Sequence, residues 1–377
     1  MKQKIAIVHD WLITIGGAEK VLRQLLIAYP EADIFCLFNF FNEQQREEIL
    51  LGKKTKSTFL ERVPFSKRHY RNIVPIFYKA VERLDVSDYD IVISSSHAVA
   101  KGVKTRKDQL HFCYCHTPMR YVWNMKKTYL SQIPERYRKL ASGQFRRMKE
   151  WDLSTSENVD QFIANSKFVQ ERIRINYGKE SVVVHPPVDT EFFDLDAESR
   201  LPEEKTYFLI VSRLVFYKRI DLAIEAFNAM PDKQLVIIGS GPEREKLEAI
   251  SKTNIKFLNF QSSDRIRQYM QHAEAAIFSA IEDFGITCLE VQACGTPVIA
   301  YDFGGYRETV IHGETGLLFK QQSKYSIIDA IGQLEGLRAK LNPHSIRENS
   351  LNFGHERFRS QINELIERRV NQNDVQD

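Results

Sequence analysis

The stretch AAIFSAIEDFGITCLEVQACGTPVIAY, residues 275–301, has the pattern of a strand, a helix and a second strand in succession. Two short apolar runs, 275–280 and 296–301, flank a segment of helical length that begins near Gly285. Short apolar runs that alternate with amphipathic segments are typical of βα units and parallel sheets. The stretch therefore predicts one βαβ unit, and the pattern continues on both sides of it.

The same alternation fills two blocks of the chain. The amino-terminal block has predicted strands at 4–9, 33–38, 90–96, 110–116, 161–166 and 182–186, and the carboxyl-terminal block has them at 207–212, 234–239, 255–260, 275–280 and 296–301. Helices are predicted over 17–30, 219–230 and 264–273. A chain of 377 residues is long for one core. We expect an α/β protein with two doubly wound domains, whose ligands bind at the carboxyl ends of the strands in a cleft between them.

The segment 186–205 is rich in proline and acidic residues and has no periodicity, so it is predicted to connect the two domains. The expected boundaries are 1–187 for the amino-terminal domain and 188–355 for the carboxyl-terminal domain.

Composition narrows the class of protein. The chain is 43% hydrophobic and 27% charged, with no apolar run of about 18 residues and a start that resembles a strand rather than a signal peptide. These features predict a cytoplasmic protein. The five cysteines are scattered through apolar segments, which indicates reduced, buried thiols, and no cysteine or histidine cluster has zinc spacing. No metal is predicted.

The net charge of +4 is unevenly distributed. Lys53–Arg83 contains nine basic and two acidic residues, and Arg136–Lys149 contains six basic residues and no acidic one. Solvated helix faces and contact with an anionic membrane surface both fit these segments, whereas a nucleic acid partner is not predicted.

Two carboxylates lie eight residues apart, at Glu282 and Glu290. On one helix their side chains would differ by roughly 80°, so they would not share a face. We therefore expect Glu282 in the loop after a strand and Glu290 one turn into the next helix. The amide groups at the start of that helix, 284–287, would favour an anion, and carboxylates beside it suit sugar hydroxyls. Acids that only cap the helix remain an alternative.

Two cations follow the first strand of the same block, at Arg213 and Lys218. Fixed positive charges near a helix start suit a diphosphate that leaves with added negative charge, although they can also be ordinary surface cations. Next, IIGSGPE supplies Gly239 and Gly241, but Arg244 stands where a dinucleotide fingerprint has its third glycine. This departure argues against a nicotinamide cofactor.

The amino-terminal block has two further candidates. Gly16 and Gly17 directly precede a predicted helix, where a backbone without Cβ can approach a phosphate or a sugar. His116 follows a predicted strand and is a candidate for contacting a sugar or a reacting hydroxyl, although a lone histidine is more often structural.

On the basis of these residues, the chain resembles the retaining GT-B glycosyltransferases of family GT4. Glu282 and Glu290 resemble their E-x7-E motif, and SRL…YK, GSGPE, FGGYRE and HGETG stand in the order of that family. HDWL…GGAEK, SSSHAVAKG and CHTPMRYVW are similar to the WbaZ-like bacterial mannosyltransferases of O-antigen and exopolysaccharide assembly.

The resemblance implies two Rossmann-like domains, with a final helix over about 356–377 that completes the amino-terminal one, and a role for each candidate residue. Glu290 would bind the nucleotide ribose, and Glu282 would bind the donor sugar. Arg213 and Lys218 would bind the diphosphate, with Gly16 and Gly17 approaching it, and His116 would contact the donor sugar or the acceptor. The remaining implied nucleotide-sugar contacts are Asp283, Phe284, Gly285, Ile286, Thr287, Gly239 and Asn259.

The implied reaction is metal-independent, retaining transfer of a hexose, in the first instance mannose from GDP-mannose, to a polyprenyl-linked or growing glycan. The enzyme would need no cofactor, and its basic segments would contact the inner membrane peripherally. A UDP-hexose donor and a non-catalytic nucleotide-sugar-binding protein remain alternatives. A nicotinamide oxidoreductase is disfavoured by the incomplete fingerprint.

Overall fold

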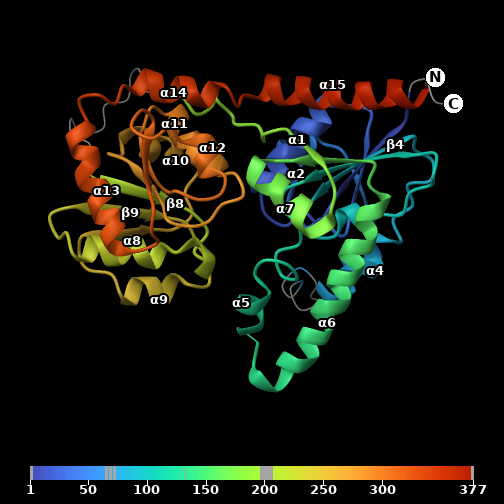
Figure 1. The fold of residues 1–377 in the computed structure, drawn as a ribbon, viewed down its shortest axis with the longest axis horizontal. Helices are drawn as coiled ribbons and strands as arrows, with labels where there is room; N and C mark the ends of the chain where they lie inside the picture. The colour runs from blue at the N-terminus through green and yellow to red at the C-terminus, as the bar shows by residue number, and fades with distance from the viewer. Residues whose placement is uncertain are drawn as a thin grey trace. The chain divides into compact units, whose positions relative to one another are not determined.

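A computed structural model gives the structure of the chain and describes residues 3–63, 67, 70, 74–131, 133–195 and 207–374. The chain divides into two compact units, coloured by residue number in Figure 1. Unit 1 consists of Met1–Pro186 together with Phe358–Asp377, and unit 2 consists of Pro187–Arg357.

Unit 1 is built on a sheet whose described strands are all parallel, in the order β3-β2-β1-β4-β5-β6-β7. The carboxyl ends of these strands therefore meet at one edge. The sequence predicts each of them except β3, which is short and polar and lies within the basic segment. The strands are β1 (Ile5–His9), β2 (Asp33–Cys36), β3 (Thr55–Ser57), β4 (Ile91–Ser96), β5 (Leu110–Cys115), β6 (Gln161–Ala164) and β7 (Ser181–Val183).

Helices cover both faces of this sheet because successive strand residues point to opposite sides. Ile7 lies in a core cluster with α1 (Gly17–Ala28), α2 (Glu43–Leu50) and α15 (His355–Asp374). Ala6 and Val8 lie in a cluster with α4 (Val74–Val81) and α6 (Glu135–Ser154). A separate cluster contains α7 (Lys167–Tyr177) together with residues of β5 and β6. From α15, the side chains of Phe358, Ile362 and Ile366 enter the first cluster. All five cysteines are buried and free of disulfides, as predicted.

Unit 2 has a second parallel sheet, with described strands in the order β10-β9-β8-β11-β12-β13. Its strands are β8 (Tyr207–Val211), β9 (Gln234–Ile238), β10 (Ile255–Leu258), β11 (Ala276–Phe278), β12 (Val298–Tyr301) and β13 (Gly316–Phe319), of which the sequence missed β13. Its helices are α8 (Ile220–Asn228), α9 (Arg244–Ala249), α10 (Ser263–His272), α11 (Ile286–Ala293), α12 (Tyr306–Thr309), α13 (Lys324–Leu337) and α14 (Pro343–Leu351). α8 and α13 cover one face of the sheet, and α10 to α12 cover the other.

The segment 186–205, which is predicted to connect the domains, contains the boundary between the two units. Val188 forms a bridge with Gly354, and Phe193 is buried in the core of unit 2. The first part of the segment is thus folded onto unit 2 by its apolar residues, and 196–205 lies outside the described residues.

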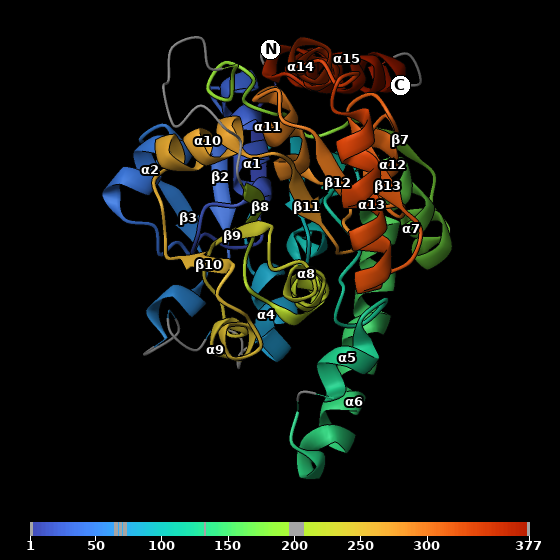
Figure 2. The same ribbon diagram turned by 90° about the vertical axis from the view of Figure 1, so that its left-hand side faces the viewer.

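A helical hairpin projects from unit 1 in both views (Figures 1 and 2). It consists of α5 (Lys126–Ser131) and the first half of α6, and its side chains are largely exposed. Among the helices described, none combines the length and the apolar composition needed to cross a bilayer.

Candidate functional site

An ion pair joins two neighbouring loops at the carboxyl edge of the unit 2 sheet. β8 and β11 are adjacent strands, and the loops that follow them contain Lys218 and Glu282. The Lys218 ammonium donates to Oε1 of Glu282, and the two side chains are 25% and 16% exposed. The same two loops are joined again by Ser279, whose hydroxyl donates to the Arg219 carbonyl at 2.9 Å. Residues 64 positions apart in the sequence therefore form one polar site.

Unused amide groups lie next to Glu282, at the start of α11. The helix begins after Gly285, which has φ +95° and whose missing Cβ would lie 2.8 Å from the ring of Tyr306. A side chain at this position would be strained by both constraints. The amides of Gly285, Ile286 and Thr287 donate no hydrogen bond to any residue that the structure describes. They are the amides that the sequence assigns to anion binding.

A second glycine-rich loop holds the Glu282 loop in place. The Gly305 amide donates to the Glu282 carbonyl at 2.9 Å, and a Cβ on Gly305 would lie 2.2 Å from Cα of Phe284. Asp283 and Phe284 are 6% and 3% exposed. Their side chains are buried, so a ligand would meet the backbone of this loop rather than these two side chains.

Glu290 lies in the second turn of α11, as the spacing predicts, and is 5% exposed. From Cys288 to Ala293 every residue of this helix is buried. Glu290 is thus enclosed by the packing of α11, whereas Glu282 lies in a loop at the edge of the sheet.

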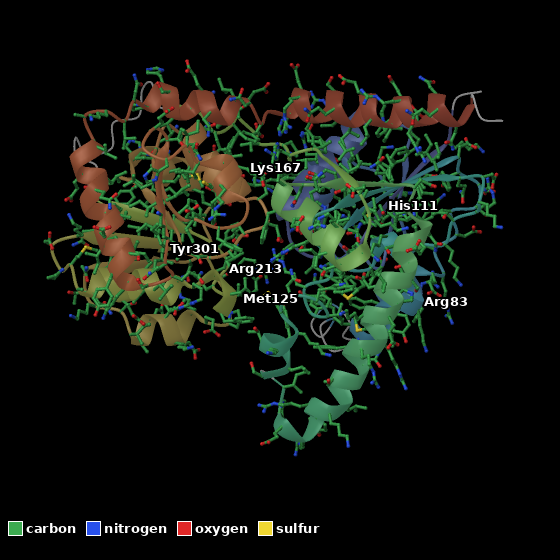
Figure 3. All side chains as sticks on the ribbon, viewed as in Figure 1. Arg83, His111, Met125, Lys167, Arg213 and Tyr301 are labelled. Atoms are coloured by element: carbon green, nitrogen blue, oxygen red, sulfur yellow. The ribbon has the colours of Figure 1, made fainter. Side chains whose placement is uncertain are left out.

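Arg213 lies in the loop after β8 and is labelled in Figure 3. Its side chain is exposed and makes no hydrogen bond or ion pair with the described part of the chain, so the structure does not join it to Lys218 or Glu282. Asn259 is also exposed and follows the edge strand β10, two positions from β8 in the sheet.

The two glycines of GSG have a structural reason for their lack of a side chain. A Cβ on Gly239, which has φ +146°, would lie 1.9 Å from the Ser212 carbonyl oxygen, and one on Gly241 would lie 2.2 Å from that of Leu214. The Leu214 amide donates to the Ser240 carbonyl at 2.9 Å. The GSG turn therefore packs directly against the loop that contains Arg213, which explains both glycines without a ligand.

Three histidines lie together at the carboxyl edge of the unit 1 sheet. His9 ends β1, His97 follows β4 and His116 follows β5, and these strands are neighbours. The Ser95 hydroxyl is 3.1 Å from Nδ1 of His9 and 2.9 Å from Nε2 of His116. The rings of His97 and His116 are 6.3 Å apart. Of the three, the sequence singled out only His116.

Asp10 fixes the loop that contains His97. Its fully buried carboxylate accepts the amides of His97, Ala98, Val99 and Ala100, at 2.6, 3.0, 2.6 and 2.7 Å. Its Oδ2 also lies 2.9 Å from Nδ1 of His97. Sequence reasoning missed this pair, although each partner is a polar residue next to the end of a buried strand, which is the signal that pointed to His116.

The histidines differ in their pKa values. Burial alone would lower the pKa of His97, but the charge and hydrogen bond of Asp10 outweigh it and raise that pKa. Burial would likewise raise the pKa of Asp10, yet its interactions with His97 bring it below its ordinary value. The pKa of His116 is lowered well below the usual range by burial and then by the charges of His97 and His9. The site thus favours a charged His97 beside a neutral His116.

Gly16 is the N-cap of α1, which starts at Gly17 as predicted. Its amide donates to Oε2 of Glu19 at 2.8 Å, and Oε1 of Glu19 lies 3.6 Å from Nε2 of His9. The start of α1 and the histidines are therefore parts of one polar edge. Within the described ranges, no group of three or more His, Cys, Asp or Glu side chains is arranged to hold a metal ion.

Two glycosyltransferase families match the chain. The family described as "Glycosyltransferase Family 4" matches residues 15–192, and "Glycosyl transferases group 1" matches residues 191–352. A relative from Mycolicibacterium smegmatis, a GDP-mannose-dependent alpha-(1-6)-phosphatidylinositol monomannoside mannosyltransferase, is 30% identical over 45% of this chain and 51% of its own length. The chain spans about half the length of the curated relatives that it matches first.

Solved structures match almost the whole chain. Sucrose-phosphate synthase from Thermosynechococcus elongatus superposes with a TM-score of 0.77 over 98% of this chain and 100% of that chain, at 18% identity. HepE of Anabaena, in complex with UDP and glucose, gives a TM-score of 0.69 over 97% of this chain and 99% of that chain, also at 18% identity. With the two parallel sheets, these likenesses confirm the predicted GT-B fold.

Proposed function

Because its two halves match two glycosyltransferase families and its fold is GT-B, we propose that the protein is a retaining hexosyltransferase. Unit 2 binds the nucleotide-sugar donor, and unit 1 binds the acceptor. The observation that supports this most directly is the Lys218–Glu282 pair beside the unused amides of Gly285, Ile286 and Thr287. One edge thereby offers a cation and amides for phosphate and a carboxylate for sugar hydroxyls.

In this proposal each unit 2 residue has a separate task. Lys218 and Arg213 bind the diphosphate and stabilise the charge that it gains as it leaves. Glu282 accepts hydrogen bonds from the donor hexose, and Glu290 accepts them from the ribose. The role of Arg213 requires its exposed side chain to turn toward the diphosphate when the donor binds.

The chemistry that we propose is front-side attack at the anomeric carbon. The bond from that carbon to the donor phosphate oxygen breaks, and the acceptor oxygen bonds on the same face. The acceptor proton passes to the departing phosphate oxygen. In place of a metal ion, Lys218, Arg213 and the α11 amides balance the negative charge of the departing diphosphate. Isolation of a covalent glycosyl-enzyme adduct would overturn this route.

For the donor we propose GDP-mannose, and for the acceptor a lipid-linked or growing glycan of bacterial surface polysaccharide. The match to a GDP-mannose-dependent mannosyltransferase supports this choice. A UDP-hexose is the second candidate, because the structural neighbour HepE was solved with UDP and glucose. A nucleotide-sugar-binding protein without activity is the third, and the presence of Glu282, Arg213 and Lys218 speaks against it.

We further propose peripheral contact with the cytoplasmic face of an anionic membrane through α6. Its basic residues Arg136, Arg138, Lys139, Arg146, Arg147 and Lys149 are all exposed, and on the same helix Leu140 is 77% exposed. Cations beside an exposed apolar side chain suit an anionic lipid surface. In the other basic segment, Lys53–Arg83, residues 64–66, 68–69 and 71–73 lie outside the described residues.

The first test is a thermal shift of the full chain with GDP, UDP, ADP, their hexose conjugates and NAD, each with and without EDTA. A ligand at about 100 times its Kd adds roughly 2.7 kcal/mol to the free energy of unfolding, which a melting curve resolves. A GDP-selective shift that survives EDTA supports the proposal. A UDP-selective shift would indicate a UDP-hexose donor instead of GDP-mannose. No shift with any nucleotide would contradict a nucleotide-sugar enzyme.

A further inference from the structure

The proposed roles do not use Asp10 and His97, although the fold holds this pair rigidly at the carboxyl edge of unit 1. We propose that Asp10 holds His97 as an imidazolium whose outer N–H binds a phosphate oxygen of a substrate. The inference rests on the proposed function in one respect, since there the phosphate comes either from the donor diphosphate or from a phosphate on the acceptor.

The geometry leaves Asp10 a positioning role. Its two oxygens accept four backbone amides, Oδ2 lies 2.9 Å from Nδ1 of His97, and the side chain is fully buried. A carboxylate with this many donors has no lone pair left for a ligand. It holds the proton on Nδ1 of His97 and orients the ring, so that Nε2 is the atom left for a partner.

The ring of His97 is held but not covered. Its side chain is 26% exposed, and the Trp11 indole contacts it edge to face with ring centroids 4.7 Å apart. A charged donor that is fixed in place and still reaches solvent is suited to a ligand that arrives from solution.

The charges around His97 favour an anionic ligand. The groups that face it are Asp10, Glu19, His9, His116 and Arg120. Both carboxylates are buried, at 0% and 8% exposure, and each is engaged by backbone amides. The cations, His97 and Arg120, reach the surface.

The helix α1 adds to this preference. Gly17 and Ala18 at its start donate no hydrogen bond from their amides to the residues that the structure describes, and the positive end of the helix dipole lies there. Glu19, from the same turn, interacts with both His9 and His97, which brings the helix start to the histidines.

A histidine–carboxylate pair can instead serve as a general base, and the two roles respond to pH in opposite ways. A base works only when Nε2 is unprotonated, so catalysis rises as pH passes the pKa of His97. A phosphate-binding cation works only when the ring is protonated, so phosphate affinity falls over the same range.

The experiment is an NMR titration of the histidine Cε1–Hε1 resonances of the full chain, from pH 5.5 to 8.5. The probes are GDP, which represents the donor phosphate, and glycerol 3-phosphate, which represents an acceptor phosphate. His97→Gln assigns the resonance, and His344→Gln, at an exposed position of α14, is the matched control. This design needs no variant of Asp10, whose loss would release four amides.

We expect one probe to raise the pKa of His97 by about one unit, which corresponds to about tenfold tighter binding to the protonated form. His97→Gln should weaken the binding of that probe about tenfold at pH 6 and remove the pH dependence of its affinity. His344→Gln should change neither the affinity nor its pH dependence. The responding probe identifies the source of the phosphate.

A His97 resonance that titrates identically with and without both probes would overturn the inference. So would a kcat that rises through the pKa of His97 in the wild type and loses that dependence in His97→Gln. Hexose transfer with an unresponsive His97 would leave the proposed function intact. Probe binding at His97 without any nucleotide-sugar turnover would support the phosphate site and count against the enzyme.

Discussion

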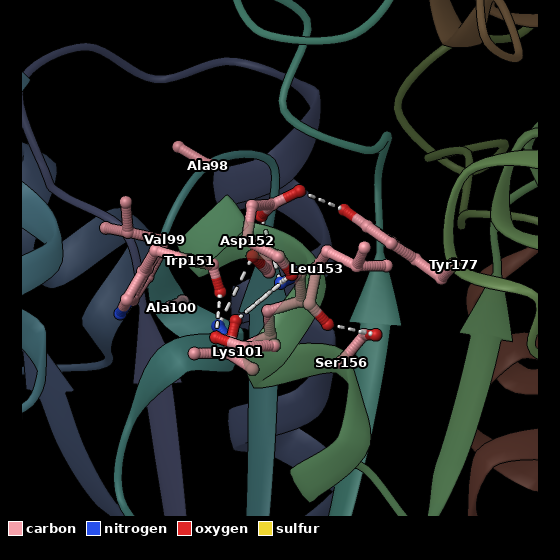
Figure 4. Close-up of polar contacts among 12 residues, drawn as sticks. Ala98, Val99, Ala100, Lys101, Trp151, Asp152, Leu153, Ser156 and Tyr177 are labelled. Atoms are coloured by element: carbon pink, nitrogen blue, oxygen red, sulfur yellow. Dashed lines mark hydrogen bonds and ion pairs between the residues drawn. The ribbon is translucent and has the colours of Figure 1, made fainter. Parts of the chain in front are cut away.

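The ammonium of Lys101 lies 2.9 Å from Oδ1 of Asp152, and neither side chain reaches solvent. Figure 4 labels both residues. Lys101 also donates to the Thr155 hydroxyl at 2.8 Å. The other oxygen of Asp152 accepts from the Trp123 indole at 2.7 Å and from the Tyr177 hydroxyl at 2.8 Å. The pair therefore joins the loop after β4, which also contains His97, to α6 and α7.

Lys101→Met should lower the free energy of unfolding by about 3–5 kcal/mol, because Asp152 would remain buried and charged without its partner. The double variant Lys101→Met/Asp152→Asn should lose less, since no net charge is left inside. Urea denaturation measures both, and Lys107→Met, at an exposed position six residues on, should stay within about 0.5 kcal/mol of the wild type. Equal stability of the two single methionine variants would contradict the prediction.

Gly102→Ala should be destabilising by about 1–3 kcal/mol, because its Cβ would lie 2.2 Å from Cζ2 of Trp151. Gly143→Ala on α6 is the matched control. Apart from its two chain neighbours and the nearby backbone of its own helix, no atom of the described residues lies within 4 Å of its Cβ, so alanine should stabilise the helix by about 0.5–1 kcal/mol. Thermal melting compares them, and shifts of the same sign would show that the Trp151 contact does not decide the effect.

His111 should make unit 1 sensitive to acid. Burial lowers its pKa to about 4, and its two ring nitrogens lie 2.9 and 3.0 Å from the Ser94 hydroxyl and the Asn158 carbonyl. Because the unfolded histidine titrates near 6.5, the unfolded state binds more protons between these values. Stability is therefore complete above pH 6.5 and is lost as pH falls toward 4.

At pH 5 the loss from His111 amounts to about 2 kcal/mol. Urea unfolding at pH 7.5 and pH 5 measures how much the free energy of unfolding differs between the two pH values. In His111→Gln this difference should be smaller than in the wild type by about 2 kcal/mol. The exposed His344→Gln should leave it unchanged. A pH dependence that is identical in all three proteins would show that His111 is not the group responsible.

Arg213→Ala and Lys218→Ala should each lower kcat by about 100-fold if these residues stabilise the leaving diphosphate. Lys256→Ala, at an exposed position on β10, should retain the wild-type rate. Steady-state kinetics with the donor found by thermal shift measures the effect. An increase confined to KM would mean that the cations bind the ground state and the transition state equally.

Replacing Lys139, Arg146 and Arg147 by glutamine should weaken binding to anionic vesicles by about 100-fold in low salt, at about 1 kcal/mol per cation. Co-sedimentation with phosphatidylglycerol vesicles measures it. The control carries the same change of charge at Lys256, Lys320 and Lys340, which are exposed on unit 2. Equal binding of the two triple variants to the vesicles would show that α6 is an ordinary solvated helix and not a membrane contact.

Elements with a local periodicity could be predicted from the sequence. The strand before Glu282 and the helix that contains Glu290 were placed correctly, because apolar residues recur within a few positions. β3 was missed because Thr55–Ser57 is polar and shows no apolar run, and β13 was missed although Gly316–Phe319 is largely apolar; each pairs with a strand that the sequence does predict.

The pairings within the sites depend on strand order, which the local pattern does not contain. Lys218 meets Glu282 because β8 lies beside β11, and Asp10 meets His97 because β1 lies beside β4. The GSG turn packs against the carbonyl oxygens of Ser212 and Leu214, which leave no room for a Cβ on Gly239 or Gly241. That contact joins loops that follow different strands.

The helix that contributes Phe358, Ile362 and Ile366 has a consequence for biosynthesis. A ribosome completes β1 to β7 first, then all of unit 2, and only afterwards the segment whose side chains enter the first core. The nascent amino-terminal region must therefore expose an apolar surface while more than a hundred further residues are translated. Chaperone demand should be concentrated in that interval, and a fragment ending at Pro186 should aggregate, whereas Pro187–Arg357 is continuous in the chain and lacks this dependence.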